Sequence, residues 1–228
     1  AYGPKNKAFL NADLKGKDLV RWKYQRYVKD YLRCVAAVDD GIGRILETLD
    51  KLDLSENSLV IYSSDQGFYL GEHGWYDKRW IYEESLKMPL VMRWPEKIKP
   101  GTIVKKLTQN IDFAPFFLEA AEAEVPEEIQ GMSLMPLFKK PNAKWRNAIY
   151  YHYYEAGGHG VPAHYGIRDE RYKLMHFPRT DEWNLVDLKK DPQEMKSFHD
   201  NPDYKETLNQ MRTKLTDLQK KYGLETSL

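Results

Sequence analysis

The sequence lacks most of the features that would select a specialised class of protein. It has one cysteine, Cys34, among 228 residues, which excludes an internal disulfide and a thiolate metal cluster, so any metal would be held by oxygen or nitrogen ligands. It has no run of about 18 consecutive apolar residues, the length that a membrane-spanning helix needs. It has no excess of one charge, since 35 basic and 34 acidic residues give a net charge of +1. We therefore expect no membrane span and no nucleic-acid partner.

The start of the chain, residues 1–7, has neither an initiator methionine nor an apolar leader segment. We therefore expect the chain to begin inside, or after processing of, something longer. A signal peptide is not present in this chain, which says nothing about the compartment of the parent protein.

A long helical pattern follows a polar start. The first ~17 residues are rich in Lys, Asn and Gly, which is typical of a loop. From residue 18 to residue 50, apolar residues recur at steps of three and four, which predicts one helix with a single stripe facing a core. The stripe consists of Tyr24, Tyr27, Val28, Tyr31, Val35, Val38, Ile42, Ile45 and Leu49.

Two short apolar runs predict strands on either side of a long loop. Residues 58–64 predict a strand buried on both faces, and residues 89–94 predict a second strand. The loop between them carries several glycines and leads into a short helical pattern at residues 80–86. Two βα units in series predict a parallel sheet, and the carboxyl ends of its strands are where open α/β sheets place their sites.

The second half of the chain changes character after residue 144. Before that point, Asn110 or Asp112 can cap a helix over residues 113–121, and residues 126–141 are irregular. After it, short aromatic and β-branched runs predict a small antiparallel sheet. The runs are residues 147–154, 165–168, 171–177 and 183–188.

The end of the chain predicts two more helical segments. Asp191-Pro192-Gln193-Glu194 has the residues that open a turn of helix, and residues 204–222 have an apolar stripe. We therefore predict an α/β fold with two parts. Residues 1–143 form part of a parallel sheet flanked by helices, and residues 144–228 form the appended antiparallel sheet with a C-terminal helix.

The long loop holds the residues with the most informative chemistry. Asp65 and Gln66 follow the first predicted strand and offer a carboxylate and an amide oxygen, which hard cations such as calcium bind. The alternative is a turn-forming Asp-Gln-Gly, because two ligands do not complete a site that takes about six to eight oxygens. Lys78 and Arg79 stand just before a predicted helix start, where backbone N–H groups also favour an anion. A metal, a lysine and a helix N-terminus together suit sulfate or phosphate.

Several short motifs follow one another along the chain. The first are Ser63-Ser64-Asp65-Gln66-Gly67, Gly71-Glu72-His73-Gly74, Lys78 with Tyr82-Glu83-Glu84, and Pro89-Leu90-Val91. The later ones are Asp112-Phe113-Ala114-Pro115, Gln130-Gly131-Met132-Ser133-Leu134, Pro136-Leu137, Tyr172-Lys173-Leu174, Leu185-Val186-Asp187-Leu188 and Asp191-Pro192-Gln193-Glu194. In this order they resemble the carboxy-terminal half of type I sulfatases, in the alkaline-phosphatase-like superfamily. The sequence departs from the family where Phe116 replaces a frequent Thr and Val186 a frequent Tyr.

The resemblance implies a role for three residues of the loop. It implies that Asp65 and Gln66 are calcium ligands, and that Lys78 binds a sulfate oxygen and assists the leaving group. The alternative for Lys78 is a solvated cation beside Asp77. The family's nucleophile is a formylglycine made in a Cys-or-Ser-x-Pro-x-Arg motif, which is absent here, as are the family's other calcium carboxylates. We therefore expect the formylglycine in a missing N-terminal part of the same domain, and an isolated chain without activity.

The aromatic residues and histidines suggest how a sugar would be recognised. The region from Tyr150 to Arg168 resembles gut-bacterial sulfatases that act on host glycans, among them those that remove 6-sulfate from N-acetylglucosamine. We predict that His164, Arg79 and Trp75 bind the substrate, although Trp75 could equally belong to a core.

The sequence as a whole predicts the C-terminal portion of a sulfatase, a sulfuric ester hydrolase that acts on a sulfated carbohydrate. Two alternatives stay open: a phosphoryl-transfer enzyme of the same superfamily, and a non-catalytic glycan-binding or interaction module. By the family resemblance, we expect the parent protein to be periplasmic or secreted.

Overall fold

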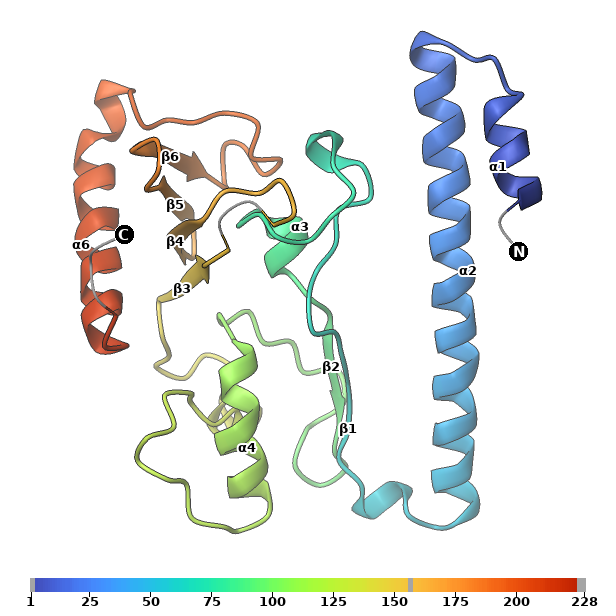
Figure 1. Cartoon of the computed structure of the whole chain (residues 1–228). Coiled ribbons are helices and arrows are strands. Elements are labelled where there is room, and N and C mark those ends of the chain that lie inside the picture. Colours follow the sequence, from blue (N-terminus) through green and yellow to red (C-terminus); the bar gives the residue numbers. More distant parts are fainter. Residues whose placement is uncertain (1–2, 156–157, 225–228) are drawn as a thin grey trace. The chain divides into compact units, whose positions relative to one another are not determined.

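The computed structural model describes residues 3–155 and 158–224. The chain divides into two compact units (Figure 1). Unit 1 contains Ala1–Ser55 and Tyr69–Asp77, and unit 2 contains Glu56–Phe68 and Lys78–Leu228. The predicted boundary after residue 143 falls within unit 2 and stays a prediction. Among the helices of the described ranges, none is both long and apolar enough to cross a bilayer.

Unit 1 is built around one long helix. The helix predicted over residues 18–50 is confirmed as α2 (Gly16–Lys51). The loop predicted for the first 17 residues is wrong, because α1 (Gly3–Leu10) occupies part of it. The only proline there, Pro4, lies in the first turn of α1, where its missing N–H costs no hydrogen bond. A short 3₁₀ turn, Glu72–Gly74, completes the unit.

The apolar stripe of α2 is present but does not face a core as predicted. None of the residues of α2 is buried, and the side chains of Val38 and Ile45 are at least half exposed. The described part of unit 1 holds no strand against which the stripe could pack. The loop 69–77 covers only a small part of it, with the ring of Tyr76 4.5 Å from that of Tyr27.

Strands β1 (Val60–Ser63) and β2 (Leu90–Arg93) form where two strands were predicted, but they pair antiparallel. The predicted parallel arrangement is therefore wrong. A parallel connection needs a crossover to the opposite end of the first strand, whereas Ser63 pairs with Leu90 at the end that the chain has just left. The segment between them contains the 3₁₀ turn Glu72–Gly74 and the one-turn helix α3 (Glu83–Leu86), neither of which is long enough to cross back over the strand. Neither strand is buried on both faces within this chain.

Two helices pack on this pair of strands. The predicted helix over residues 113–121 is confirmed as α4 (Phe113–Ala120), which follows the 3₁₀ turn Asn110–Asp112. The stretch 126–141, predicted to be irregular, contains the short helix α5 (Met135–Lys139). The buried residues of this core are Phe116, Leu134 and Leu137.

The appended antiparallel sheet is confirmed, with the strand order β3-β4-β5-β6. Its strands are β3 (Ala148–Tyr153), β4 (His164–Asp169), β5 (Tyr172–Phe177) and β6 (Glu182–Asp187). The last predicted helix is confirmed as α6 (Lys205–Lys221), which follows the 3₁₀ turn Pro202–Tyr204 and lies along one face of the sheet (Figure 1). Leu208, Met211 and Leu215 of α6 form the core on that face.

The segment that contains α3 packs on the opposite face of the sheet. Ile81, fully buried, packs there with Met175 and Val186. A Cβ on Gly166 would lie 2.8 Å from Cδ1 of Ile81 and would also collide with the backbone of β5. Glycine at this position therefore leaves the space in which Ile81, just before α3, approaches the sheet.

The turn predicted at residues 191–194 forms as a single turn, in which the backbone N–H of Glu194 donates to the carbonyl of Asp191 at 3.1 Å, but no helix continues from it. The backbone N–H of Lys196 donates to the carboxylate of Asp191, but Glu194 adopts a left-handed conformation with φ of 53°. That conformation ends a helical turn and directs Glu194 into the interior, where its side chain is buried.

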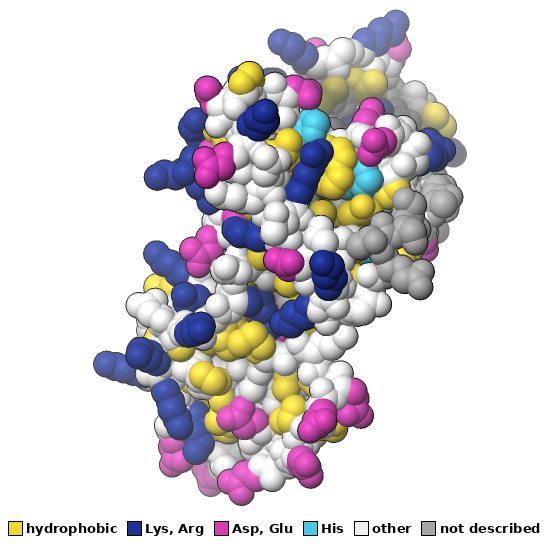
Figure 2. All heavy atoms as spheres, turned by 90° about the vertical axis from the view of Figure 1, so that its left-hand side faces the viewer, with side chains coloured by type: hydrophobic (Ala, Val, Ile, Leu, Met, Phe, Trp, Pro, Cys, Tyr) yellow, Lys and Arg dark blue, Asp and Glu magenta, His cyan; other side chains and the backbone are white. Residues whose placement is uncertain are grey.

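Charges of both signs share the surface of the molecule. Figure 2 shows one face on which Lys and Arg side chains occur together with Asp and Glu. One such pair joins α6 to the sheet, with Nζ of Lys214 2.5 Å from the carboxylate of Asp169.

A buried ion pair ties α4 to the start of the appended sheet. The carboxylate of Asp112 is fully buried and accepts two hydrogen bonds from Arg146, each 2.5 Å long. It also accepts the backbone N–H groups of Gln109 and Met132 at 2.8 Å. Every oxygen lone pair of this carboxylate thus points at a donor, which is the condition for burying a charge.

We predict that Arg146→Ala lowers the free energy of unfolding by about 3–5 kcal/mol, because it leaves the Asp112 charge buried without its partner. The matched control is Arg33→Ala. Arg33 also pairs with an aspartate, Asp30, at 2.6 Å, but its side chain is 72% exposed, so the loss is expected to stay within about 1 kcal/mol. Urea unfolding of both variants measures the difference, and equal losses would contradict this account.

Candidate functional site

The candidate site begins where β1 ends. Asp65 and Gln66 follow Ser63, the last residue of the strand, as the sequence predicts. The side chain of Asp65 is exposed, whereas Gln66 is half-buried. The carboxylate of Asp65 is therefore accessible from solvent, and the backbone that carries it is held by the paired strand.

A buried serine connects Gln66 to Lys78. Ser85, in α3, is fully buried. The side-chain nitrogen Nε2 of Gln66 lies 2.8 Å from Oγ of Ser85 and 2.9 Å from its carbonyl oxygen. Oγ of Ser85 in turn donates to the backbone carbonyl of Lys78 at 2.6 Å. The structure thus brings together two residues that are twelve positions apart in the loop, and sequence reasoning did not identify the serine that does so.

Helix α3 is itself anchored by buried charges. Nζ of Lys173, which is fully buried, lies 2.6 Å from Glu194 and 3.0 Å from Glu83. Arg168 donates to both carboxylate oxygens of Glu83. Glu194 also accepts the backbone N–H of Glu83, the first residue of α3, at 2.6 Å. The N-terminus of the helix is therefore held by groups from β4, from β5 and from the loop after β6.

The two carboxyl groups of this network titrate in opposite directions. Burial raises the pKa of Glu194, and this exceeds the lowering caused by Lys173. Burial also acts to raise the pKa of Glu83, but the charge of Lys173 and the hydrogen bond from Arg168 outweigh it, so that pKa lies below its usual value. Glu83 is thus the carboxylate with two cationic partners, which favours its charged form.

Arg79 is placed beside a polar cluster at the end of β3. Its carbonyl oxygen accepts a 2.5 Å hydrogen bond from Tyr151, and its side chain interacts with the hydroxyl of Tyr153. Tyr153 donates to Glu155 at 2.7 Å, and Nδ1 of His159 lies 2.9 Å from the same carboxylate. Hydrogen bonds from Tyr153 and His159 lower the pKa of Glu155. The sequence pattern does not indicate this cluster, because Tyr151 and Arg79 are 72 residues apart in the chain and meet only in the folded structure.

His164 lies in the interior rather than at the surface. It is 0% exposed, and its ring stacks on that of Trp80 with 5.3 Å between centroids. Nδ1 donates to the carbonyl of Pro162 at 2.9 Å, and burial lowers the pKa of the imidazole. Nε2 has no hydrogen-bond partner among the described residues. His164 thus packs among the rings of Trp80 and Phe177, and its predicted contact with a substrate stays a prediction.

Trp75 belongs to unit 1, where it packs with other rings of its loop. Its ring meets that of Tyr69 edge-on at 5.7 Å and lies 5.6 Å from that of His73. His73 has a positive φ of 55°, which few residues other than glycine adopt. The predicted contact between Trp75 and a substrate stays a prediction.

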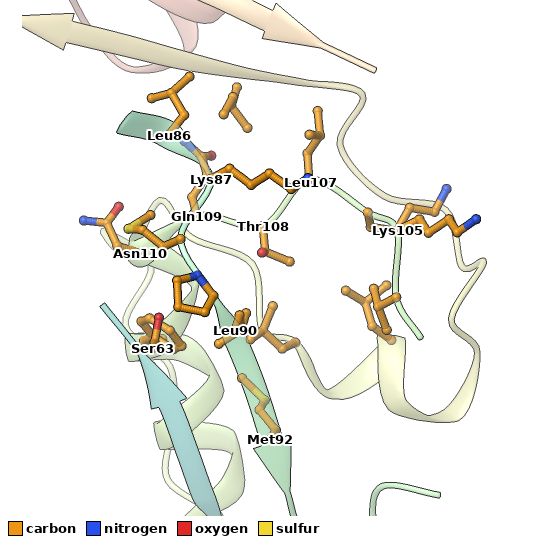
Figure 3. A pocket seen from close by; sticks show the side chains of 18 of the residues that line it. Ser63, Leu86, Lys87, Leu90, Met92, Lys105, Leu107, Thr108, Gln109 and Asn110 are labelled. Atoms are coloured by element: carbon orange, nitrogen blue, oxygen red, sulfur yellow. The ribbon is translucent and has the colours of Figure 1, made fainter. Parts of the chain in front are cut away.

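A cavity of about 490 Å³ opens next to the end of β1 (Figure 3). Its wall includes Ser63 and Ser64, which directly precede Asp65, together with apolar residues of β2 such as Leu90. Lys87 and Lys105 also line it. Ile149 of β3 and Arg168 of β4 line it as well, so the cavity extends from the end of β1 to the appended sheet.

The donor atoms of the site fit a hard cation. Asp65 offers a carboxylate and Gln66 an amide oxygen, which are the ligands that calcium prefers. Across residues 3–155 and 158–224, no group of three or more His, Cys, Asp and Glu side chains is arranged to hold a metal. Asp65 and Gln66 are therefore the candidate ligands at this point, and two ligands alone do not complete a calcium site.

Family models match most of the chain. A model described as "Sulfatase" matches residues 3–123, and one described as "N-sulphoglucosamine sulphohydrolase, C-terminal" matches residues 71–221. The chain is 47% identical over 227 residues to an N-acetylglucosamine-6-O-sulfatase of Bacteroides thetaiotaomicron, covering 97% of this chain and 41% of the relative. It is 33% identical to the human N-acetylglucosamine-6-sulfatase over 53% of this chain and 22% of that protein. The chain thus spans less than half the length of these relatives.

Solved structures agree with these matches. A protein in complex with its substrate D-glucosamine-2-N,6-O-disulfate superposes with a TM-score of 0.93 and 46% identity, over 97% of this chain and 46% of that one. A phosphonate monoester hydrolase from Silicibacter pomeroyi superposes with a TM-score of 0.80 over 92% of this chain and 44% of that one, and at 23% identity it shows a shared fold alone.

We predict that Gly67→Ala destabilises unit 2 by about 1–3 kcal/mol, because a Cβ there would meet backbone atoms that cannot move aside. It would lie 2.6 Å from the carbonyl oxygen of Ser85 and closer still to that of Glu84. The matched control is Gly43→Ala in α2, where a Cβ meets no atom within 4 Å and the helix gains about 0.5–1 kcal/mol. Thermal unfolding compares them, and a neutral Gly67→Ala would refute the close approach.

Proposed function

The chain belongs to the sulfatase family, and we propose that it is the carboxy-terminal portion of an enzyme that hydrolyses sulfate monoesters of carbohydrates. One observation carries the proposal. Ser85 hydrogen-bonds to the side chain of Gln66 and to the backbone carbonyl of Lys78, so one buried residue holds both the candidate cation ligand and the lysine near the end of β1. That arrangement occurs in a chain that matches an N-acetylglucosamine-6-O-sulfatase along 97% of its length.

Asp65 and Gln66 would hold a calcium ion in this enzyme. A bound divalent cation polarises the sulfate group and lowers the pKa of a nucleophile beside it. Lys78 would bind a sulfate oxygen and stabilise the negative charge that develops on the leaving oxygen. The nucleophile, a formylglycine, and further calcium carboxylates would come from the part of the parent protein that this chain does not include.

The appended sheet would recognise the sugar. The B. thetaiotaomicron relative is an N-acetylglucosamine-6-O-sulfatase, so the proposed substrate is a glucosamine that carries a 6-sulfate. Arg79 lies beside Lys78 and contacts Tyr153, so the cluster of Tyr153, Glu155 and His159 would meet the sugar next to its sulfate. Glu155 would accept hydrogen bonds from sugar hydroxyls. His164 and Trp75 stay predicted substrate contacts from the sequence, without a placement at this surface.

We propose a periplasmic or secreted parent protein, as in the family that the sequence resembles. A phosphoryl-transfer enzyme and a non-catalytic glycan-binding module are the alternatives. Activity assays distinguish these alternatives. A phosphoryl-transfer enzyme would hydrolyse phosphate esters in preference to sulfate esters, and a glycan-binding module would hydrolyse neither.

We predict that Lys78→Ala in the parent protein lowers kcat and kcat/KM together, by on the order of 100-fold or more, for every sulfate ester tested. The reason is that Lys78 acts mainly on charge that develops in the transition state. Lys205→Ala, an exposed lysine at the start of α6, is the control and should match the wild type. Steady-state kinetics on an aryl sulfate and on N-acetylglucosamine 6-sulfate measure this effect.

The isolated chain should turn over neither sulfate ester. Activity from this chain alone would contradict the assignment of the nucleophile to the rest of the parent. Preferred turnover of a phosphate ester by the parent would support the phosphoryl-transfer alternative instead.

We predict that Asp65→Ala abolishes both calcium binding and activity of the parent, whereas Gln66→Ala weakens both less. A carboxylate contributes a full charge to the ion, and an amide oxygen contributes only a dipole. Asp217→Ala, an exposed aspartate on α6, is the control. Calorimetric titration with calcium gives the affinities, and an unchanged affinity in Asp65→Ala would return Asp65 and Gln66 to the role of turn formers.

A further inference from the structure

We infer that Ser85 is a positioning residue that orients Gln66 toward the cation and holds Lys78 at the sulfate. The inference rests on the proposed function and adds to it a residue that contacts neither substrate nor cation. Ser85 is fully buried in α3, and its side-chain oxygen bonds to both partners at once. A serine that only filled space at this position would need neither bond.

The directions of the hydrogen bonds determine which way the amide of Gln66 faces. A hydroxyl has one hydrogen to donate, and that of Ser85 goes to the carbonyl of Lys78, which can only accept. Oγ of Ser85 therefore has only lone pairs left for Gln66, and the carbonyl of Ser85 can also only accept. Both acceptors lie within 2.9 Å of Nε2 of Gln66. The NH₂ group of the amide must face Ser85, so the amide oxygen faces the opposite way.

This orientation is the one that a cation requires. The two amide atoms of Gln66 differ in that only the oxygen can coordinate a metal ion. Without Oγ, the NH₂ group would keep only the carbonyl of Ser85 as an acceptor, so the amide would be held less firmly and its oxygen would face the ion for less of the time. Partners that orient metal ligands in this way typically contribute 10–100-fold to affinity or activity.

The same serine limits the position of Lys78. Its hydroxyl bonds to the carbonyl of Lys78, and its own carbonyl accepts the N–H of Gly67 at 3.0 Å. The two ends of the segment that joins the cation ligand to the lysine therefore meet on one residue. Lys173 and Glu194 hold the N-terminus of α3 against the appended sheet. Ser85 of α3 therefore fixes Gln66 and Lys78 relative to that sheet.

The test uses Ser85→Ala in the full-length parent protein, with calcium binding measured by calorimetry, kinetics on a sulfate ester, and thermal unfolding. We expect the calcium dissociation constant to rise about 10–100-fold and kcat to fall with a smaller change in KM. Ser85→Cys, which keeps a weak donor and acceptor, should recover part of the affinity. Leu215→Ala, a buried residue of the core under α6, is the control: it should lower the unfolding temperature without changing calcium affinity.

A double variant tests whether Ser85 acts through Gln66. If it does, Ser85→Ala should add little to the loss of calcium affinity already caused by Gln66→Ala. Fully additive losses would overturn the inference. So would a Ser85→Ala variant that is less stable but binds calcium as tightly as the wild type.

The outcomes separate this inference from the proposed function. A parent protein that hydrolyses sulfate esters, with a Ser85→Ala variant of wild-type calcium affinity, would leave the function standing and overturn the role of Ser85. A parent protein that binds calcium but hydrolyses no sulfate ester would overturn the function, while the calcium titrations would still decide the role of Ser85. A wild type that binds no calcium would overturn both.

Discussion

The buried ammonium group of Lys173 is the constraint on which the rest of unit 2 depends. Removing a lysine charge from water costs several kcal/mol, which only well-placed carboxylates can offset. Glu194 and Glu83 meet that requirement at 2.6 and 3.0 Å, and each comes from a different segment. Glu194 reaches inward because its backbone leaves the helical region, and Glu83 is the first residue of α3. Neutralising one buried charge therefore fixes the helix that carries Ser85.

Besides this ion pair, close approaches between backbone segments bring the parts of the site together. Gly166 lets Ile81 touch the sheet, and Gly67 lets the loop after β1 touch α3. Both glycines have ordinary backbone angles, so they are needed for space and not for a left-handed conformation. The consequence is that Gln66 and Lys78 have little freedom to separate, because the loop that carries them is held at both ends. A preorganised site of this kind loses little free energy to reorganisation when charge develops on a substrate.

The two faces of the appended sheet have different tasks. Helix α6 covers one face with an apolar core and stabilises the sheet. The other face receives the α3 segment, and the end of β3 carries the polar cluster of Tyr153, Glu155 and His159 beside Arg79. Of these groups, only Tyr153 is placed by strand pairing, since Glu155 and His159 lie in the connection after β3. Under the proposed function, variation in the length or composition of the β3–β4 connection would change recognition of the sugar without changing Lys78.

Local patterns in the sequence determined the long helix α2, the positions of strands β1 to β6 of the described residues, the helix α6 and the candidate residues Asp65, Gln66 and Lys78. Each of these depends on periodicity or on a motif within a few residues. Tertiary structure decided the rest. The antiparallel pairing of β1 and β2 depends on which end the chain returns to, and the interior position of His164 depends on which segment covers the sheet. Ser85 carries no signal in its neighbours, since its importance comes from partners 7 and 19 residues away. Such contacts exist only once a buried charge and two close backbone approaches have placed α3 on the sheet.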